Sequence, residues 1–362
     1  MVAQPKTPPP QIAAHGDLDE WVRHVVGIHF HPTHGTPFWI ERARELRLDA
    51  RSAIRGYADL AKLGFFPIDA LRTRNVLDFL PADVARDRGR LRIDETGGTT
   101  GAPARIAVRD FYEPVNQFIN WYLDEVVGFP RGGNWLFIGP TGPHAVAESI
   151  RQMARTRGGM AYFIDLDPRF IKVLYQQQDM RTVGLYMKHI RSQAYAILES
   201  QQIDVLGSTP ILLQALAPEL KERGYRFSGV MYGGTQLSPD LYHLLRTEYF
   251  PDAAHTAVYG NTLMGGALLG PLQPGETDIV YYPIEPLVKL EVVDPKEPER
   301  RVGMRESGQI SVTVLSEERF LPNVLERDKA ERWPALPALG WEGVANVRPL
   351  AAMPTGATEG VY

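Results

Sequence analysis

The 362-residue sequence contains no cysteine. Without a thiol, the chain has no disulfide, no thiolate nucleophile and no zinc–thiolate centre, and it cannot carry an acyl group as its own thioester. Any thioester would therefore be formed on a partner. The sequence also lacks a run of 18 apolar residues and a charged-then-apolar amino terminus, so we expect a cytoplasmic protein without a membrane-embedded segment.

An excess of basic residues is also missing. The chain has 43 Asp and Glu against 39 Lys and Arg, a formal net charge of -4. Proteins that bind nucleic acid or anionic lipid need a basic surface, so neither partner is expected. With 44% apolar and 23% charged residues, the composition is that of a globular chain long enough for two or three packed subdomains.

One stretch is unusually rich in glycine and threonine. Residues 96–103 read Thr-Gly-Gly-Thr-Thr-Gly-Ala-Pro, between two short segments with the alternation of hairpin strands. Such a loop exposes backbone N–H and hydroxyl donors, which suit a phosphate. The G-x-x-x-x-G-K-[ST] string of ATPases and the G-x-G-x-x-G string of dinucleotide-binding proteins are both absent. The alternative interpretation is a hairpin loop with accidental composition.

The rest of the chain divides by pattern. Residues 1–14 are proline-rich and predict a disordered tail, and residues 15–80 predict helices. From there, strands alternate with helices up to about residue 272, and the pattern then becomes strands without long helices up to residue 330. This predicts an α/β fold of two mostly parallel sheets flanked by helices, in two subdomains, plus a small antiparallel β-barrel or sheet. The predicted helices cover 111–127, 145–157, 187–200, 210–223 and 239–250, and the predicted strands cover 134–140, 160–166, 203–206, 229–232, 256–259, 278–283, 287–293 and 309–315.

Small and hydroxylated residues follow four of the predicted strands directly, at 139–142, 207–210, 233–236 and 260–262. In parallel sheets, ligands bind at the carboxyl ends of strands. One such turn is uninformative, because small residues are common in strand-to-helix turns. Four of them, together with the glycine loop, favour a single binding crevice.

Four histidines, His24, His29, His31 and His34, lie close together in the sequence. No carboxylate or cysteine stands beside them at the spacing of metal ligands, and Gly27 and Pro32 predict turns instead of one rigid face. We interpret them as surface or packing residues and predict no metal site formed by the protein.

At this point the motifs resemble a known family. The loop at 96–103 resembles the phosphate loop of the adenylate-forming superfamily, which includes acyl-CoA synthetases, adenylation domains of peptide synthetases and luciferases. The string Tyr259-Gly-Asn-Thr262 matches most of the superfamily's Tyr-Gly-x-Thr-Glu motif, and Arg327-Asp328 follows at a suitable distance. The segments 37–39 and 208–210 resemble the phenylacetate-CoA ligase branch, and the likeness covers roughly residues 35–330.

The resemblance implies the large N-terminal domain of these enzymes and a reaction in which a carboxylate attacks the α-phosphate of ATP, giving an acyl adenylate and pyrophosphate. It implies that the glycine loop holds the β- and γ-phosphates, that Gly233 and Gly234 line the adenine, and that Tyr259 stacks on it. Asp328 would accept from the ribose hydroxyls, and Thr262 would contact the α-phosphate, with Arg105 as a further phosphate contact. The expected site comprises, for the nucleotide, Thr96, Gly97, Gly98, Thr99, Thr100, Gly101, Gly233, Gly234, Thr235, Tyr259, Gly260, Asn261, Thr262 and Asp328, and for the acid, Phe137, His144, Ser208, Thr209 and Tyr232.

Three departures from the family pattern stand out. The magnesium-binding glutamate is replaced by Leu263, so any Mg²⁺ would rest on phosphate oxygens and water. The lysine expected soon after the loop is missing, and Arg105 is the candidate substitute. The residues 331–362 are expected to form a tail that is too short for the family's lid domain and its lysine. In this the chain resembles short members from antibiotic biosynthesis, phenazine pathways among them.

Three functions stay open. The protein could activate an aromatic carboxylic acid, phenazine carboxylates included, as an adenylate for a partner reductase or transferase. It could be a degenerate member that binds an adenylate or aryl acid without chemistry. It could also be an aryl-CoA ligase completed by a lid-bearing partner protein. The resemblance further implies a possible homodimer.

Overall fold

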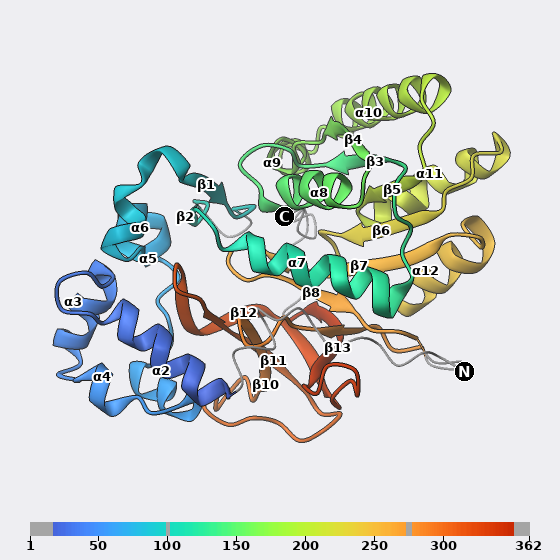
Figure 1. Ribbon diagram of the computed structural model, residues 1–362. Helices are drawn as coiled ribbons and strands as arrows, with labels where there is room; N and C mark the ends of the chain where they lie inside the picture. Colours follow the sequence, from blue (N-terminus) through green and yellow to red (C-terminus); the bar gives the residue numbers. More distant parts are fainter. Residues whose placement is uncertain (1–16, 99–101, 273–276, 351–362) are drawn as a thin grey trace.

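The computed structural model describes residues 17–98, 102–272 and 277–350. Its described strands form one eleven-stranded sheet and a separate two-stranded hairpin (Figure 1). The strands are β1 (Arg92–Glu95), β2 (Arg105–Val108), β3 (Asn134–Gly139), β4 (Met160–Asp165), β5 (Val205–Ser208), β6 (Gly229–Gly233), β7 (Ala254–Asn261), β8 (Gly265–Leu269), β9 (Val280–Tyr282), β10 (Val288–Val293), β11 (Ser307–Leu315), β12 (Phe320–Trp333) and β13 (Gly343–Pro349). In the large sheet the order is β10-β11-β12-β13-β9-β8-β7-β6-β5-β3-β4.

Helices lie beside both halves of this sheet (Figure 1). Those described are α2 (Leu18–His29), α3 (Pro37–Glu45), α4 (Ala50–Ala53), α5 (Ala70–Thr73), α6 (Ala82–Arg86), α7 (Tyr112–Tyr122), α8 (Ala145–Thr156), α9 (Pro168–Gln176), α10 (Met180–Ser200), α11 (Pro210–Glu222) and α12 (Pro239–Leu244). Short 3₁₀ segments lie at Tyr57–Leu63, Val76–Phe79 and Arg88–Arg90, and π-helical turns extend α7 over Leu123–Val127 and α12 over Leu245–Tyr249. No helix in these ranges is long and apolar enough to cross a membrane.

The strands from β3 to β7 form the parallel half of the sheet. The first four of these strands in the sequence, β3 to β6, are each followed by a helix, whereas β7 is followed by β8. β5 is buried along its whole length, as expected for a parallel strand covered on both faces. The helices predicted at 111–127, 145–157, 210–223 and 239–250 are confirmed, with ends that differ by a few residues. The helix predicted at 187–200 is longer, because α10 begins at Met180 behind an Asp179 cap.

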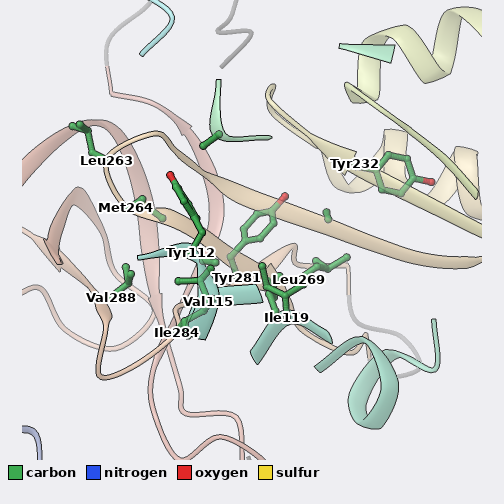
Figure 2. Close-up of a cluster of buried hydrophobic side chains, with 14 of the residues drawn as sticks. Tyr112, Val115, Ile119, Tyr232, Leu263, Met264, Leu269, Tyr281, Ile284 and Val288 are labelled. Atoms are coloured by element: carbon green, nitrogen blue, oxygen red, sulfur yellow. The ribbon is translucent and has the colours of Figure 1, made fainter. Parts of the chain in front are cut away.

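The antiparallel half does not form the separate small sheet or barrel that the sequence predicted. The unpredicted strand β8 pairs with β7 on one side and β9 on the other, and so joins both halves into one sheet. This hairpin requires glycine, because a Cβ at Gly260 would lie 2.0 Å from the carbonyl oxygen of Gly265. Val115 and Ile119 of α7 pack over the same junction, near Leu269 (Figure 2).

The prediction of a tail after residue 330 is also wrong for its described part. β12 continues to Trp333, and β13 lies between β12 and β9, where Val344 and Ala345 are fully buried. These two apolar residues form too short a pattern to predict a strand from sequence, and their pairing partners lie elsewhere in the chain.

The N-terminal helices lie beside the antiparallel half (Figure 1). The indole nitrogen of Trp21 donates to the carbonyl of Leu315 at 3.0 Å, and that of Trp39 donates to the carbonyl of Phe320 at 2.9 Å. His29, one of the four clustered histidines, is fully buried, with its ring nitrogens 2.6 Å from the Thr36 hydroxyl and 2.9 Å from the Ser316 carbonyl. Burial lowers the pKa of His29 to about 4, so it is a neutral packing residue at pH 7.

Candidate active site

The turns that follow the central strands converge on one cavity of about 110 Å³. It lies at the carboxyl ends of β3, β5, β6 and β7, between α7 and α8. The sequence predicted this crevice, and nine of the predicted site residues line it: Phe137, Ser208, Thr209, Tyr232, Gly233, Gly234, Gly260, Asn261 and Thr262. The walls are mostly apolar, and none of the described lining residues is charged.

Thr262 connects the cavity to the glycine loop. Its hydroxyl donates to the backbone carbonyl of Glu95 at 2.9 Å, at the end of β1 and directly before the loop. On the other side, the Tyr112 hydroxyl donates to the carbonyl of Thr262 at 3.2 Å. The motif at 259–262 is therefore joined by direct hydrogen bonds to the hairpin at 92–108, through Glu95, and to α7, through Tyr112.

The described ends of the loop have hairpin geometry. The N–H of Thr96 donates to the Ala104 carbonyl, and the N–H of Ala104 donates to the Thr96 hydroxyl, both at 3.0 Å. Gly98 has a φ of 66°, a conformation that favours glycine. The predicted site residues Thr99, Thr100 and Gly101 lie outside the described residues. Thr96, Gly97 and Gly98 are described but are not among the lining residues of the cavity.

The hairpin carries an ionic cluster around Glu95. Its carboxylate accepts from Arg105 of β2 and from Arg169 of α9, each at 2.8 Å. Burial acts to raise the pKa of Glu95, but the hydrogen bonds from the two guanidinium groups lower it overall. Arg105, predicted as a phosphate contact, is thus engaged with Glu95, although its side chain stays 48% exposed.

The helix α9, which the sequence analysis missed, adds two cations to the loop. Arg169 donates to the carbonyl of Thr96 at 3.1 Å, and Lys172 donates to the carbonyl of Gly98 at 3.0 Å. The helix could have been found from its start: Asp167 precedes Pro168 and caps the N–H groups of Arg169 and Phe170.

Tyr259 and Asp328 lie together on β7 and β12. The Tyr259 hydroxyl donates to a carboxylate oxygen of Asp328 at 3.1 Å. Burial raises the pKa of Asp328, an effect that the hydrogen bond from Tyr259 partly opposes. Neither side chain is among those that line the cavity, so this pair lies beside it and not in its wall.

Asn261 shapes the turn between β7 and β8. Its side-chain oxygen accepts from the N–H groups of Leu263 at 2.9 Å and Met264 at 3.2 Å, and its amide nitrogen donates to Glu326 at 2.8 Å. Burial raises the pKa of Glu326, and the nearby Asp328 charge raises it further. The predicted nucleotide residue Asn261 therefore has a structural role in this turn.

Leu263 is 3% exposed, and its carbonyl accepts from the buried Arg319 at 2.8 Å. An alkyl side chain thus stands where the resemblance has a magnesium ligand, and it supplies no oxygen for Mg²⁺. Among the described residues, no group of three or more His, Cys, Asp or Glu side chains has the arrangement of a metal site.

Most of the polar groups predicted for the acid pocket form hydrogen bonds within the protein. Ser208 donates to the carbonyl of Ile138 at 2.6 Å, and Thr209 caps α11. The Tyr232 hydroxyl lies 2.6 Å from His255 Nδ1 and is directed away from the cluster of α7 and β8 side chains (Figure 2). His144 is buried outside the cavity lining. Burial and then the charge of Arg169 lower its pKa, so it is neutral at pH 7.

Comparison with solved structures shows that the fold is similar to that of a CoA ligase. A 2-hydroxyisobutyryl-CoA ligase, solved with 2-HIB-AMP and CoA in the thioesterification state, aligns with a TM-score of 0.60 over 93% of this chain and 67% of its own, at 14% sequence identity. An open conformation of that ligase, also with 2-HIB-AMP and CoA, aligns with a TM-score of 0.59 over 92% of this chain and 74% of its own, again at 14% identity. No family model matches the sequence, and no curated protein does.

Proposed function

We propose that the protein activates a carboxylic acid as its acyl adenylate, with ATP as the second substrate. A carboxylate oxygen attacks the α-phosphorus, the bond to the β-phosphate breaks, and pyrophosphate leaves with the bonding electron pair. The observation that carries this proposal is the hydrogen bond from Thr262 to Glu95. It brings the motif at 259–262 to the start of the glycine loop, beside a cavity that Gly233, Gly234 and Gly260 line.

In this proposal Gly233 and Gly234, at the end of β6, lie along the adenine. The Thr235 hydroxyl, which is buried without a hydrogen-bond partner among the described residues, is available to the base. The Tyr259 ring stacks on the purine, and Asp328 accepts from the ribose diol, a role for which a carboxylate is well suited. Thr262 exchanges its bond to Glu95 for one to the α-phosphate. Any Mg²⁺ is held by phosphate oxygens and water.

The acid that fits the cavity is apolar and uncharged apart from its carboxylate. The described lining contains no charged side chain that would pair with an amino group or a second carboxylate. The cavity of about 110 Å³ is smaller than the cavity of about 150 Å³ that holds benzene in an engineered protein. We therefore propose an acid no larger than a single aromatic ring, and a phenazine carboxylate would extend beyond these walls.

Pyrophosphate–ATP exchange with a panel of acids tests the proposal. The panel contains benzoate, phenylacetate, 2-hydroxyisobutyrate, phenazine-1-carboxylate and, as the charged control, phenylalanine. We expect exchange with at least one neutral aryl acid and none with phenylalanine. Folded protein that supports exchange with no acid would contradict the proposal.

A second candidate function is binding of an adenylate or aryl acid without chemistry, which the buried Leu263 favours because no metal ligand replaces the missing glutamate. Calorimetric binding of AMP, with ATP unchanged after long incubation with each acid, would support it. Transfer of the acyl group by a partner reductase, transferase or lid-bearing protein is a further proposal. Action as a homodimer is another. Thioester that forms only when a candidate partner and CoA are added would identify the lid-bearing case.

A further inference from the structure

The helix α9 presents two basic side chains to the glycine loop. Arg169 and Lys172 are three residues apart and so share one face of the helix. The Arg169 guanidinium donates to the Thr96 carbonyl and the Glu95 carboxylate, and the Lys172 ammonium donates to the Gly98 carbonyl. Both cations are therefore placed at the start of the loop by specific contacts.

Charged side chains gather around the described part of this loop. Three basic side chains, Arg105, Arg169 and Lys172, contact the hairpin, and the first two share the Glu95 carboxylate. Asp165, at the end of β4, accepts from the N–H of Thr141, and Asp167, which caps α9, accepts from the N–H groups of Arg169 and Phe170. The Arg169 Nε is buried and has no hydrogen-bond partner among the described residues.

We propose that Arg169 and Lys172 bind the β- and γ-phosphates of ATP and stabilise the pyrophosphate as it leaves. This inference rests on the proposed function. A planar guanidinium and a compact ammonium both bind phosphate well. They supply, from α9, positive charge at a site that lacks the lysine expected soon after the loop.

The test compares Arg169→Gln and Lys172→Gln with Lys188→Gln, which removes an exposed lysine of α10. Titration calorimetry measures the binding of ATP, inorganic pyrophosphate and AMP. We expect Kd for ATP and pyrophosphate to rise about tenfold or more in the first two variants, because a charge-assisted contact is lost. AMP, which lacks both phosphates, should bind within about twofold of the wild type by the same reasoning, and Lys188→Gln should change nothing.

Lys172→Arg keeps the charge and should restore most of the ATP affinity. Arg169→Gln also loses the contact with Glu95, so thermal unfolding is used to show whether this variant is folded. If it is not, the comparison of Lys172→Gln with Lys172→Arg tests the phosphate contact alone. Unchanged ATP affinity in Lys172→Gln, or an equal loss for AMP and ATP, would overturn this inference alone. Wild-type protein that binds neither AMP nor ATP would instead overturn the proposed function itself.

Discussion

The hydroxyl of Thr262 donates to the backbone carbonyl of Glu95 across 2.9 Å, although the two residues are 167 positions apart. Glu95 ends β1 and Thr262 follows β7, so this bond joins the hairpin that carries the glycine loop to the central sheet. Any phosphate held by that loop would lie next to the threonine that lines the cavity. The following predictions depend on this arrangement.

Thr262→Val removes the hydroxyl at nearly constant volume. We expect the exchange rate to fall about 10²-fold, as when one preorganised donor is removed from an active site, and stability to fall by about 1 kcal/mol for the lost hydrogen bond. The matched control is Thr256→Val, because Thr256 is fully buried and its hydroxyl has no partner among the described residues. That variant should keep its activity and gain stability; equal losses in both variants would contradict the account.

Asp328→Asn should change nucleotide binding and folding stability in opposite directions. We expect Kd for AMP to rise about tenfold, because a charged acceptor for the ribose diol is lost. Burial raises the pKa of this carboxyl, so its ionisation opposes folding as the pH rises. The variant should therefore be more stable than the wild type at pH 8, with a difference that shrinks toward pH 4 in urea unfolding. A variant that loses stability at pH 8 would argue against the buried environment of Asp328.

Val146→Phe places a larger side chain into the wall of the cavity from α8. Since Val146 is only partly buried, the cost in stability should be below about 2 kcal/mol. The KM for the acid should rise about tenfold while the KM for ATP stays the same. Thr156→Phe, exposed at the end of the same helix, is the control and should leave both constants unchanged. A parallel rise in both KM values would place the acid elsewhere.

The buried His29 makes the fold sensitive to acid. Its pKa is about 4 in the folded protein and near 6.5 when unfolded, so between these values the unfolded chain binds more protons and stability falls as the pH is lowered. The loss from this residue approaches roughly 3 kcal/mol at pH 4. Urea unfolding of His29→Gln should show a shallower dependence between pH 6.5 and 4.5 than His24→Gln, which changes an exposed histidine. Identical slopes would contradict the assignment.

The sequence predicted the parts of the site that local motifs encode. The turns at Ser208 and Gly233 follow buried strands, and strands of one parallel sheet end at the same edge, so their convergence followed from the alternation of strands and helices. The direction of the Tyr232 hydroxyl did not follow, because its partner His255 belongs to the next strand.

The remaining features depend on distant pairings. Strand β8 joins both halves of the sheet through contacts with β7 and β9, which no local pattern reveals. The contact between Lys172 and Gly98 spans 74 positions and involves no recognised motif. The predicted tail contains β13, and its buried residues Val344 and Ala345 pair with β9, which is distant in the sequence.

The most direct test of the central claim, that nucleotide and acid share one site, is calorimetric titration with a non-hydrolysable acyl-adenylate analogue, an aryl acid joined to adenosine through a sulfamoyl group. If both halves bind side by side, the analogue should bind at least 10²-fold more tightly than AMP or the free acid, because one binding event gains both sets of contacts. The Thr262→Val variant should lose part of this gain. An analogue that binds no more tightly than AMP alone would contradict the account.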